Sequence, residues 1–459
     1  MKIEILDSIE CQVSVADGKI LFPLLSHEAV FWKQGPYRKT RHTYRKSAFS
    51  FQGKTHWCFY TGLLPRVRKW TEEQGIPLEV IGEEIKIPRQ NPPILKGPGF
   101  KEFREDQLKL IDVACTQQRG VISSPTGSGK TLMQLGILSC YTKSRALVLA
   151  HSTEIISQTF KKLQEFGFKN IETFGGGFAA QKPTAQITVA TMQSFIKIDP
   201  EDYVDYYDIV IIDESHHTQK QDSTYATILS HLLAPIRIGF TATTRTNDEA
   251  ILINEGLIGP IIGKMTIEEA AELEILARPK LRLIKAKCSQ AILDIRKYQE
   301  VYEYGIVRNQ LRNQQIAEIV RDFYKQKKTV LIFVVHLEQG DLIAKEIEKV
   351  VGIKVPFIQG NMPQEERTAI KKKLISKKIK VCLATTSWSE GVDIPSLCVV
   401  IMAGAGKSEL QTLQRLGRGL RRTKDKDEVI IIDFLDLTHM YLIRQTGERL
   451  STYSDNNWL

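Results

Sequence analysis

The sequence lacks the features that mark secreted, membrane-spanning and metal-stapled proteins. None of its 459 residues lies in an apolar run that approaches the roughly 18 needed to cross a bilayer. The N-terminus alternates acidic and apolar residues, which is unlike a signal peptide. Seven cysteines are scattered without a C-x-x-C pair, which argues against a disulfide or zinc framework. We therefore expect a cytoplasmic or nucleoid-associated protein.

Acidic residues are missing from one basic stretch near the N-terminus. Residues 31–70 contain ten Lys or Arg, ten aromatic residues and no Asp or Glu, and the whole chain has a net charge of +10. Lysine and arginine neutralise phosphates, and aromatic rings stack on exposed bases. The alternative, an aromatic core beneath a solvated cationic face, explains the aromatics but not the missing acids. We predict that residues 1–92 form an accessory nucleic-acid-binding domain, with contacts from Lys33, Arg38, Lys39, Arg41, Arg45 and Lys46.

A phosphate-binding loop is predicted at residues 124–131, which read Ser-Pro-Thr-Gly-Ser-Gly-Lys-Thr. An apolar run precedes the loop and a helix-prone run follows it, which is the strand–loop–helix context that such a loop requires. Backbone N–H groups at a helix N-terminus form an anion site suited to a triphosphate. Ser124 stands where the first glycine is usual. We expect ATP contacts from Pro125, Thr126, Gly127, Ser128, Gly129, Lys130 and Thr131, with the Thr131 hydroxyl on Mg²⁺.

An acidic pair follows a predicted buried strand further along the chain. From about residue 100, apolar runs alternate with helical segments, which is typical of a parallel α/β sheet. The run Tyr207–Ile212 leads directly into Asp213 and Glu214. Ligands of such sheets bind at the carboxyl ends of the strands. We therefore assign Asp213 to Mg²⁺ and Glu214 to orienting the water that attacks the γ-phosphate.

These motifs resemble those of the superfamily 2 helicases and translocases, over residues 100–435. The run Asp213-Glu214-Ser215-His216 resembles the D-E-x-H motif of the DNA-repair and branch-migration branch, which includes XPB-type and phage UvsW-like helicases. The resemblance implies two RecA-like lobes. It also implies that Arg104 and Gln107 read the adenine. In this family, the nucleic-acid backbone would be contacted by His151, Ser152, Thr191, Gln193 and Ser194.

A second α/β series over residues 266–459 carries two further motifs. The resemblance implies that Thr385, Thr386 and Ser387 hold a phosphate of the tracked strand, and that Gly391 and Asp393 face the nucleotide. Residues 414–421 match the Q-R-x-G-R-x-x-R motif without a gap. Arginines three residues apart share a helix face, so two guanidinium groups can reach one γ-phosphate. The catalytic set is therefore completed by Gln414, Arg418 and Arg421.

The sequence predicts an α/β protein with two tandem RecA-like parallel-sheet lobes, at residues 93–265 and 266–459, after a small α+β N-terminal domain. We expect an ATP- and Mg²⁺-dependent DNA helicase or translocase that unwinds or branch-migrates forked or recombination-intermediate DNA. By resemblance alone it would move 3′ to 5′, as a monomer on DNA, alongside replication or recombination proteins. Two alternatives stay open: an RNA helicase, and a duplex-translocating subunit of a larger restriction-type complex.

Overall fold

The structure of the protein, a computed structural model, describes residues 1–34, 39–175, 182–218, 223–242, 248–385, 388, 394–404 and 426–455. The chain divides into two compact units. The first contains residues 1–124 and 129–265, and the second contains residues 125–128 and 266–459. Over the part of the chain that the structure describes, no helix is both long and apolar enough to cross a membrane.

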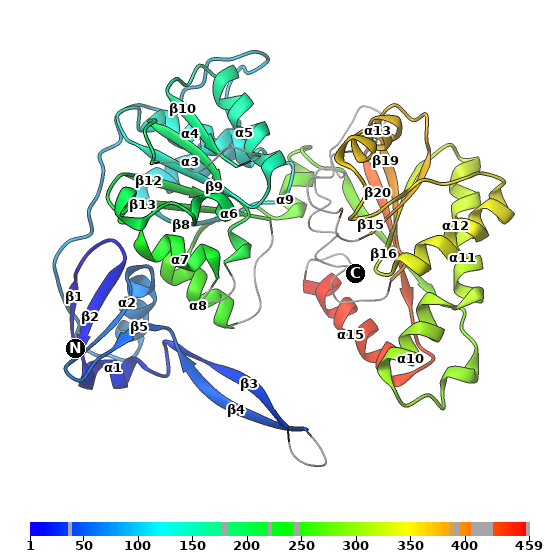
Figure 1. Cartoon of the computed structure of the whole chain (residues 1–459), viewed down its shortest axis with the longest axis horizontal. Coiled ribbons are helices and arrows are strands. Elements are labelled where there is room, and N and C mark those ends of the chain that lie inside the picture. The colour runs from blue at the N-terminus through cyan, green and yellow to red at the C-terminus, as the bar shows by residue number, and fades with distance from the viewer. Residues whose placement is uncertain are drawn as a thin grey trace. The chain divides into compact units, whose positions relative to one another are not determined.

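The N-terminal region contains a five-stranded sheet and a separate hairpin. The sheet has the order β5-β6-β2-β1-β7 and packs with two helices around its own apolar cluster. The hairpin pairs Ser26 with Ser47 and Gln34 with Lys39, and Figure 1 shows it projecting away from the sheet. The elements are β1 (Lys2–Ile5), β2 (Glu10–Ser14), α1 (Val15–Leu21), β3 (Ser26–Gln34), β4 (Lys39–Ser47), β5 (Phe49–Gln52), β6 (His56–Tyr60), α2 (Leu64–Glu73) and β7 (Glu79–Ile81).

The N-terminal region packs directly on helix α8 (Asp248–Leu257) of the first lobe. Leu252 of α8 is a member of the N-terminal apolar cluster and is only 4% exposed. The backbones also approach closely, since a Cβ atom added to Gly62 would lie 2.2 Å from the carbonyl oxygen of Glu255. Both regions therefore belong to one compact unit. The domain boundary at residue 92 stays a prediction.

The first lobe is a seven-stranded parallel sheet with helices on both faces (Figure 1). The strand order is β10-β11-β9-β12-β13-β8-β14. Alternate residues of β12 enter different cores: Ile209 and Ile211 pack with α3, α4 and α5, while Val210 and Ile212 pack with α6, α7 and α8. The elements are α3 (Glu105–Gln117), β8 (Arg119–Ser123), α4 (Lys130–Cys140), β9 (Ala146–Ala150), α5 (Thr153–Glu165), β10 (Ile171–Phe174), β11 (Ile187–Thr191), α6 (Met192–Phe195), β12 (Ile209–Ile212), α7 (Thr224–His231), β13 (Ile236–Thr241) and β14 (Ile261–Lys264).

The second lobe is a six-stranded parallel sheet of order β15-β20-β19-β16-β18-β17. Its largest described core lies between this sheet and helices α11 and α12. The fold class predicted from the sequence, two parallel-sheet lobes after an α+β region, is confirmed. The elements are α9 (Ile267–Glu272), β15 (Arg278–Lys285), α10 (Tyr298–Tyr302), α11 (Gln310–Lys325), β16 (Thr329–Val334), α12 (Leu337–Val351), β17 (Phe357–Ile358), α13 (Gln364–Ile375), β18 (Val381–Thr385), β19 (Leu397–Met402), β20 (Glu428–Leu435) and α15 (Met440–Asp455).

Candidate active site

The phosphate-binding loop joins the carboxyl end of β8 to the first turn of α4. Gly127 and Gly129 adopt the left-handed φ values of 97° and 98°, which favour glycine. Gly129 also has no room for a side chain, because an added Cβ would lie 2.3 Å from Gln107 Nε2. Lys130 is the first residue of α4. The strand–loop–helix context expected from the sequence is therefore present.

Lys130 and Glu214 form the centre of the candidate site. Lys130 Nζ lies 3.6 Å from Glu214 Oε1 and donates to the carbonyl oxygen of Ser124 at 3.4 Å. On the other side, Glu214 Oε2 lies 3.2 Å from His216 Nδ1, and the same nitrogen is 3.2 Å from Thr241 Oγ1. A chain of polar contacts thus runs from α4, past the end of β12, to the end of β13.

Glu214 is held in a charged and strained state. Burial alone would raise the pKa of its carboxyl group, but Lys130, His216 and His151 outweigh burial and hold that pKa well below its usual range. Its backbone is left-handed, with φ of 49°, which costs a non-glycine residue roughly 1–2 kcal/mol. Strain of this kind gathers at active sites. A carboxylate that stays ionised can accept a hydrogen bond from a water molecule.

Asp213 offers carboxylate oxygen at the end of β12. Its side chain is buried and accepts a hydrogen bond of 3.1 Å from Gln134 Nε2 of α4. Thr131 is in the first turn of the same helix. Carboxylate and hydroxyl oxygens are ligands that suit Mg²⁺. The residues present therefore fit the magnesium role predicted for Asp213 and Thr131, and Gln134 is a neighbour that sequence reasoning missed.

The predicted adenine-reading residues begin helix α3. Arg104 is the N-cap and forms a two-point ion pair with Asp106, at 2.9 and 2.8 Å. Gln107 Oε1 accepts from the backbone N–H of Arg104 at 3.2 Å, and its amide lies against Gly129. The structure thus brings Gln107 to the phosphate-binding loop.

The predicted nucleic-acid contacts of this lobe lie at the carboxyl ends of β9 and β11. Ser152 and Thr191 cap helices α5 and α6 with their hydroxyls, which accept from Ile155 N and Ser194 N. Gln193 is exposed and Ser194 is partly buried. Since β9 lies between β11 and β12 in the sheet, these residues sit beside the ATP motifs on the same edge.

Three histidine rings connect the ATP motifs around Glu214 with the predicted nucleic-acid contacts. The rings of His216 and His217 are 4.3 Å apart, and those of His217 and His151 are 4.7 Å apart. His217 is thus in ring contact both with the neighbour of Glu214 and with a predicted nucleic-acid residue. Sequence reasoning assigned nothing to His217, and the pair of adjacent histidines was the one signal available.

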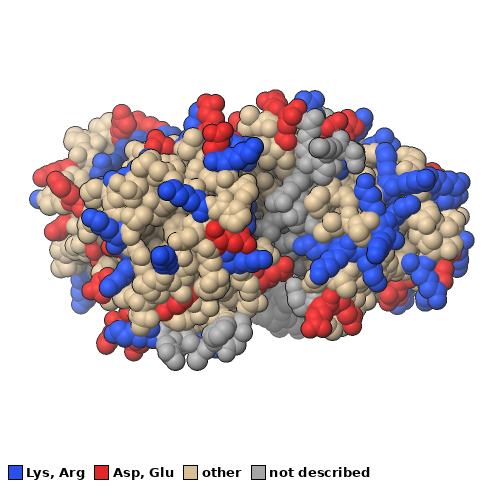
Figure 2. Space-filling model, turned by 90° about the horizontal axis from the view of Figure 1, so that it is seen from above, with Lys and Arg blue, Asp and Glu red and all other residues tan. Residues whose placement is uncertain are grey.

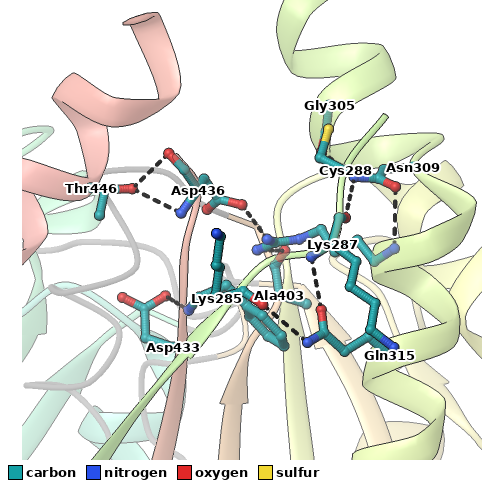
Figure 3. Close-up of polar contacts among 12 residues, drawn as sticks. Lys285, Lys287, Cys288, Gly305, Asn309, Gln315, Ala403, Asp433, Asp436 and Thr446 are labelled. Atoms are coloured by element: carbon teal, nitrogen blue, oxygen red, sulfur yellow. Dashed lines mark hydrogen bonds and ion pairs between the residues drawn. The ribbon is translucent and has the colours of Figure 1, made fainter. Parts of the chain in front are cut away.

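Several predicted residues of the second lobe lie outside the described part of the chain: Thr386, Ser387, Gly391, Asp393, Gln414, Arg418 and Arg421. Thr385 is described, and it lies buried at the carboxyl end of β18. The carboxyl ends of the nearby strands β19 and β20 are joined by a buried network of charged residues. Arg312 pairs with Asp436 and donates to the Ala403 carbonyl at 3.1 Å, and Thr446 contacts Asp436 (Figure 3). This network fixes the ends of β19 and β20, which flank the predicted arginine motif.

The predicted basic contacts of the N-terminal region divide into two sets. Arg38 lies outside the described residues, and the side chains of Lys33, Lys39 and Arg41 are also outside the description. Arg45 donates to Ser26 Oγ and to the Pro23 carbonyl, both at 3.0 Å. Lys46 forms an ion pair of 2.9 Å with Glu249 of α8. The last two residues therefore hold the base of the hairpin, and their nucleic-acid role stays a prediction.

Comparison with known proteins places this site in a family. Residues 100–246 match the type III restriction enzyme, res subunit, and residues 312–423 match the helicase conserved C-terminal domain. Over 406 residues the chain is 26% identical to the DNA 3′-5′ translocase XPB2 of Sulfurisphaera tokodaii, covering 80% of this chain and 87% of that one. The chain belongs to the superfamily 2 helicases, and it is similar to XPB-type members of them. This helicase is therefore an ATP-hydrolysing enzyme.

Other relatives of the helicase differ in length. It is 23% identical to the ATP-dependent DNA helicase uvsW of Enterobacteria phage T4, over 77% of this chain and 75% of that one. It spans only 54% of the putative ATP-dependent helicase IRC3 of Saccharomyces cerevisiae, at 24% identity. Among solved structures, the Hef helicase domain of Pyrococcus furiosus has a TM-score of 0.52 at 17% identity, and covers 75% of this chain and 97% of that one. That structural likeness supports the fold.

Proposed function

We propose that the protein is an ATP-dependent DNA helicase or translocase that acts on forked or branched DNA. The observation that carries the proposal is the contact chain from Lys130 through Glu214 and His216 to Thr241. It joins the phosphate-binding loop to an ionised carboxylate at the carboxyl edge of a parallel sheet, where ligands bind in such folds. A protein that only bound nucleotide would not need this carboxylate.

The residues around ATP would have separate tasks. Lys130 would hold the outer phosphates, and Asp213 and Thr131 would hold Mg²⁺, which neutralises charge on the phosphates when bound. Glu214 would orient the attacking water, since its carboxylate remains ionised. Gln107 and Arg104 would read the adenine. Arg418 and Arg421 would stabilise charge in the transition state, with Gln414, Gly391 and Asp393 beside the nucleotide.

DNA is the substrate that the comparisons favour. XPB2 is named a DNA 3′-5′ translocase and uvsW an ATP-dependent DNA helicase, which supports DNA and 3′ to 5′ movement for this chain. The projecting hairpin adds a reason to expect a branched substrate, because its strands run through the acid-free basic stretch. His151, Ser152, Thr191 and Thr385 would track one strand. We propose action as a monomer.

A restriction-type translocating subunit is the second candidate. The observation in its favour is the match of residues 100–246 to the res subunit of type III restriction enzymes. Such a subunit would translocate along duplex DNA without separating the strands. The two candidates therefore differ in whether a fork is resolved.

One panel of assays tests the proposal. ATP hydrolysis is measured with matched single-stranded, duplex and forked DNA and with RNA, at a fixed and stated salt concentration, because binding of a polyanion weakens steeply with salt. Strand separation is followed on the fork. We expect the largest stimulation with forked DNA, together with strand separation or branch migration. Stimulation by RNA alone would overturn the choice of DNA, and duplex-stimulated hydrolysis without any strand separation would favour the restriction-type candidate.

A further inference from the structure

Much of the positive charge of the second lobe lies at the amino ends of three neighbouring strands. Strands β16, β18 and β17 are adjacent in the sheet. The segments that lead into them, residues 321–328, 371–380 and 345–354, contain thirteen Lys or Arg and three Asp or Glu. This surplus of ten equals the net charge of the whole chain. Figure 2 shows Lys and Arg gathered over the right-hand part of the molecule, in the same region.

Within the part of the chain that the structure describes, ion pairs leave most of the positive charge of this surface unpaired. Two of the three acidic residues are already paired, Asp322 with Arg321 and Glu346 with Lys349. Among the residues that the structure describes, no ion pair to Asp or Glu involves the nine lysines that we call the amino-edge patch. Seven of the nine are exposed, while Lys328 and Lys380 are partly buried. The amino-edge patch comprises Lys325, Lys327, Lys328, Lys354, Lys372, Lys373, Lys377, Lys378 and Lys380.

Backbone contacts bring the three segments together. The backbone N–H of Val330 donates to the Lys380 carbonyl at 2.7 Å, and that of Leu383 donates to the Pro356 carbonyl at 2.9 Å. Residues 373 and 379 are joined by a hydrogen bond of 3.1 Å. The amino ends of the strands and the end of α13 therefore form one continuous surface.

This surface is distinct from the edge of the sheet that carries the motor motifs. Lys380 comes directly before β18, whereas the predicted strand contact Thr385 ends it. Strand β16 has six residues, so the two edges are about 20 Å apart at ~3.3 Å per residue. The amino-edge patch is thus too far away to share the phosphates that Thr385 would hold.

Helix-end electrostatics do not account for the patch. A lysine near a helix C-terminus is stabilised by the helix dipole, and α11 and α13 both end here. That effect acts within the last turn and explains one or two lysines per helix, not nine. Lys327 and Lys377 moreover adopt left-handed φ values of 58° and 57°, where glycine is the favoured residue. Lysine occupies both positions although it is the less favourable choice for the backbone.

We propose that the amino-edge patch binds the phosphate backbone of a duplex DNA arm outside the motor site. Lysines are flexible point charges that suit phosphates without reading bases. The nearby rings of Phe323 and Tyr324 lie beneath Lys328 and Lys380, each 5.7 Å from the ammonium nitrogen. They offer no open platform on which the bases of a single strand would stack. The exposed large apolar residue of α13 is Ile375, which is too little for insertion into a membrane surface.

The proposal rests on the proposed function and is tested in the whole 459-residue chain. The patch variant K372Q/K373Q/K377Q/K378Q is compared with K101Q/K143Q/K161Q/K169Q, which removes the same number of charges from exposed lysines of the first unit. Binding to forks with a long or a shortened duplex arm is measured by fluorescence anisotropy over a range of salt. The ATPase assay gives the half-saturating DNA concentration and the turnover number. Vesicles of anionic lipid serve as a further probe.

We expect the patch variant to need about tenfold more of the long-armed fork for half-saturation, with turnover at saturating DNA unchanged. Its plot of log affinity against log salt should be shallower by about 2–4, because each phosphate contact adds roughly 0.9 to the slope. The proposal would be overturned if the two variants bound the long-armed fork equally well. It would also be overturned if the patch variant lost as much affinity for the short-armed fork, or if it lost affinity only for lipid vesicles. Failure of the proposed function would appear differently, as wild-type hydrolysis that no nucleic acid stimulates.

Discussion

Asn254 Nδ2 donates a hydrogen bond of 2.7 Å to the carbonyl oxygen of Ser215. Helix α8 therefore holds the turn that carries Glu214 and His216. The same helix is bound to the N-terminal region through Lys46 and Glu249, at 2.9 Å, and through Arg66 and Glu255, at 3.0 Å. A cavity of about 270 Å³ lies beside helix α8. Its lining includes Arg66 of the N-terminal region, His216 of the catalytic turn and Asn254 of α8. One helix thus joins the hairpin-bearing region to the catalytic turn.

We predict that Asn254→Ala weakens the stimulation of ATP hydrolysis by forked DNA. Mutations along such a contact path change coupling by 0.5–2 kcal/mol, which is about two- to thirty-fold. Basal hydrolysis should change much less, because Asn254 touches a carbonyl behind the site and not the predicted nucleotide ligands. The control is Asn91→Ala, which removes an exposed amide bonded to Thr142. If forked DNA stimulated ATP hydrolysis equally in both variants, helix α8 would not couple DNA binding to hydrolysis.

Lys130→Ala and Glu214→Gln should each abolish nearly all turnover. Removing a positioned acid–base or electrostatic group costs about 10² to 10⁴ in rate. The glutamine variant keeps the size of the side chain but loses its charge, so the ion pair with Lys130 is lost without a cavity. Steady-state ATPase assays with and without DNA measure the effect, and circular dichroism verifies folding. Normal DNA-stimulated hydrolysis in both variants would contradict the proposed mechanism.

The hairpin can be tested without removing the whole N-terminal region. Deletion of residues 1–92 would expose Leu252 of α8, which the N-terminal core covers. A cleaner variant replaces residues 30–43 by Asn-Gly, a two-residue turn that suits a hairpin, between the paired residues Ala29 and Tyr44. Lys46 and its partner Glu249 then remain. We expect basal ATPase to persist and fork processing to be lost, as followed by gel assays of branched DNA. A truncated protein that still resolves forks would refute the hairpin's role.

His217→Ala should separate DNA stimulation from basal hydrolysis. The ring of His217 lies between those of His151 and His216, whereas the carboxylate of Glu214 contacts Lys130 and His216. The basal ATPase rate should stay within about threefold of the wild-type rate. The coupling free energy between DNA binding and ATP hydrolysis should fall by roughly 0.5–2 kcal/mol. His231→Ala, at an exposed helix end, is the control. The ATPase rate at saturating DNA is the measurement, and an unchanged rate in H217A would exclude the role.

The sequence predicted the sheets well because buried parallel strands leave continuous apolar runs. The run Tyr207–Ile212, which was predicted to be a buried strand, contains β12 at Ile209–Ile212. Short segments that mix polar and apolar residues are harder to predict from the sequence. Strand β7 has only three residues, Glu79–Ile81, and helix α9 has only six, Ile267–Glu272.

The candidate site was predicted in part for a related reason. Local motifs indicated Lys130, Asp213 and Glu214, because their chemistry is confined to a few adjacent residues. Contacts between segments that are distant in the chain have no local motif. The hydrogen bonds of Gln134 with Asp213 and of Asn254 with Ser215 were therefore not predicted. The hairpin was missed because β4 has four charged residues among its nine, and strand predictions rest on apolar alternation. Its basic character was visible, but the pairing of β3 with β4 was not.

Two glycine substitutions should change stability in opposite directions. In Gly62→Ala the new Cβ would lie 2.2 Å from Glu255 O and 2.5 Å from Gly256 O. Both are backbone atoms that cannot move aside, so the N-terminal region must shift on α8, at a cost of about 1–3 kcal/mol. Gly447 lies exposed within α15, with nothing within 4 Å of an added Cβ. Gly447→Ala should therefore stabilise the second lobe by roughly 1 kcal/mol.

The measurement for both variants is thermal unfolding with limited proteolysis, which assigns each transition to a lobe. We expect G62A to lower the transition of the first unit and to leave the second unchanged. G447A should raise the transition of the second lobe alone. The two units have separate cores, so neither effect should cross between them. A G62A protein that unfolds at the wild-type temperature would show that the N-terminal region is not docked on α8 as described.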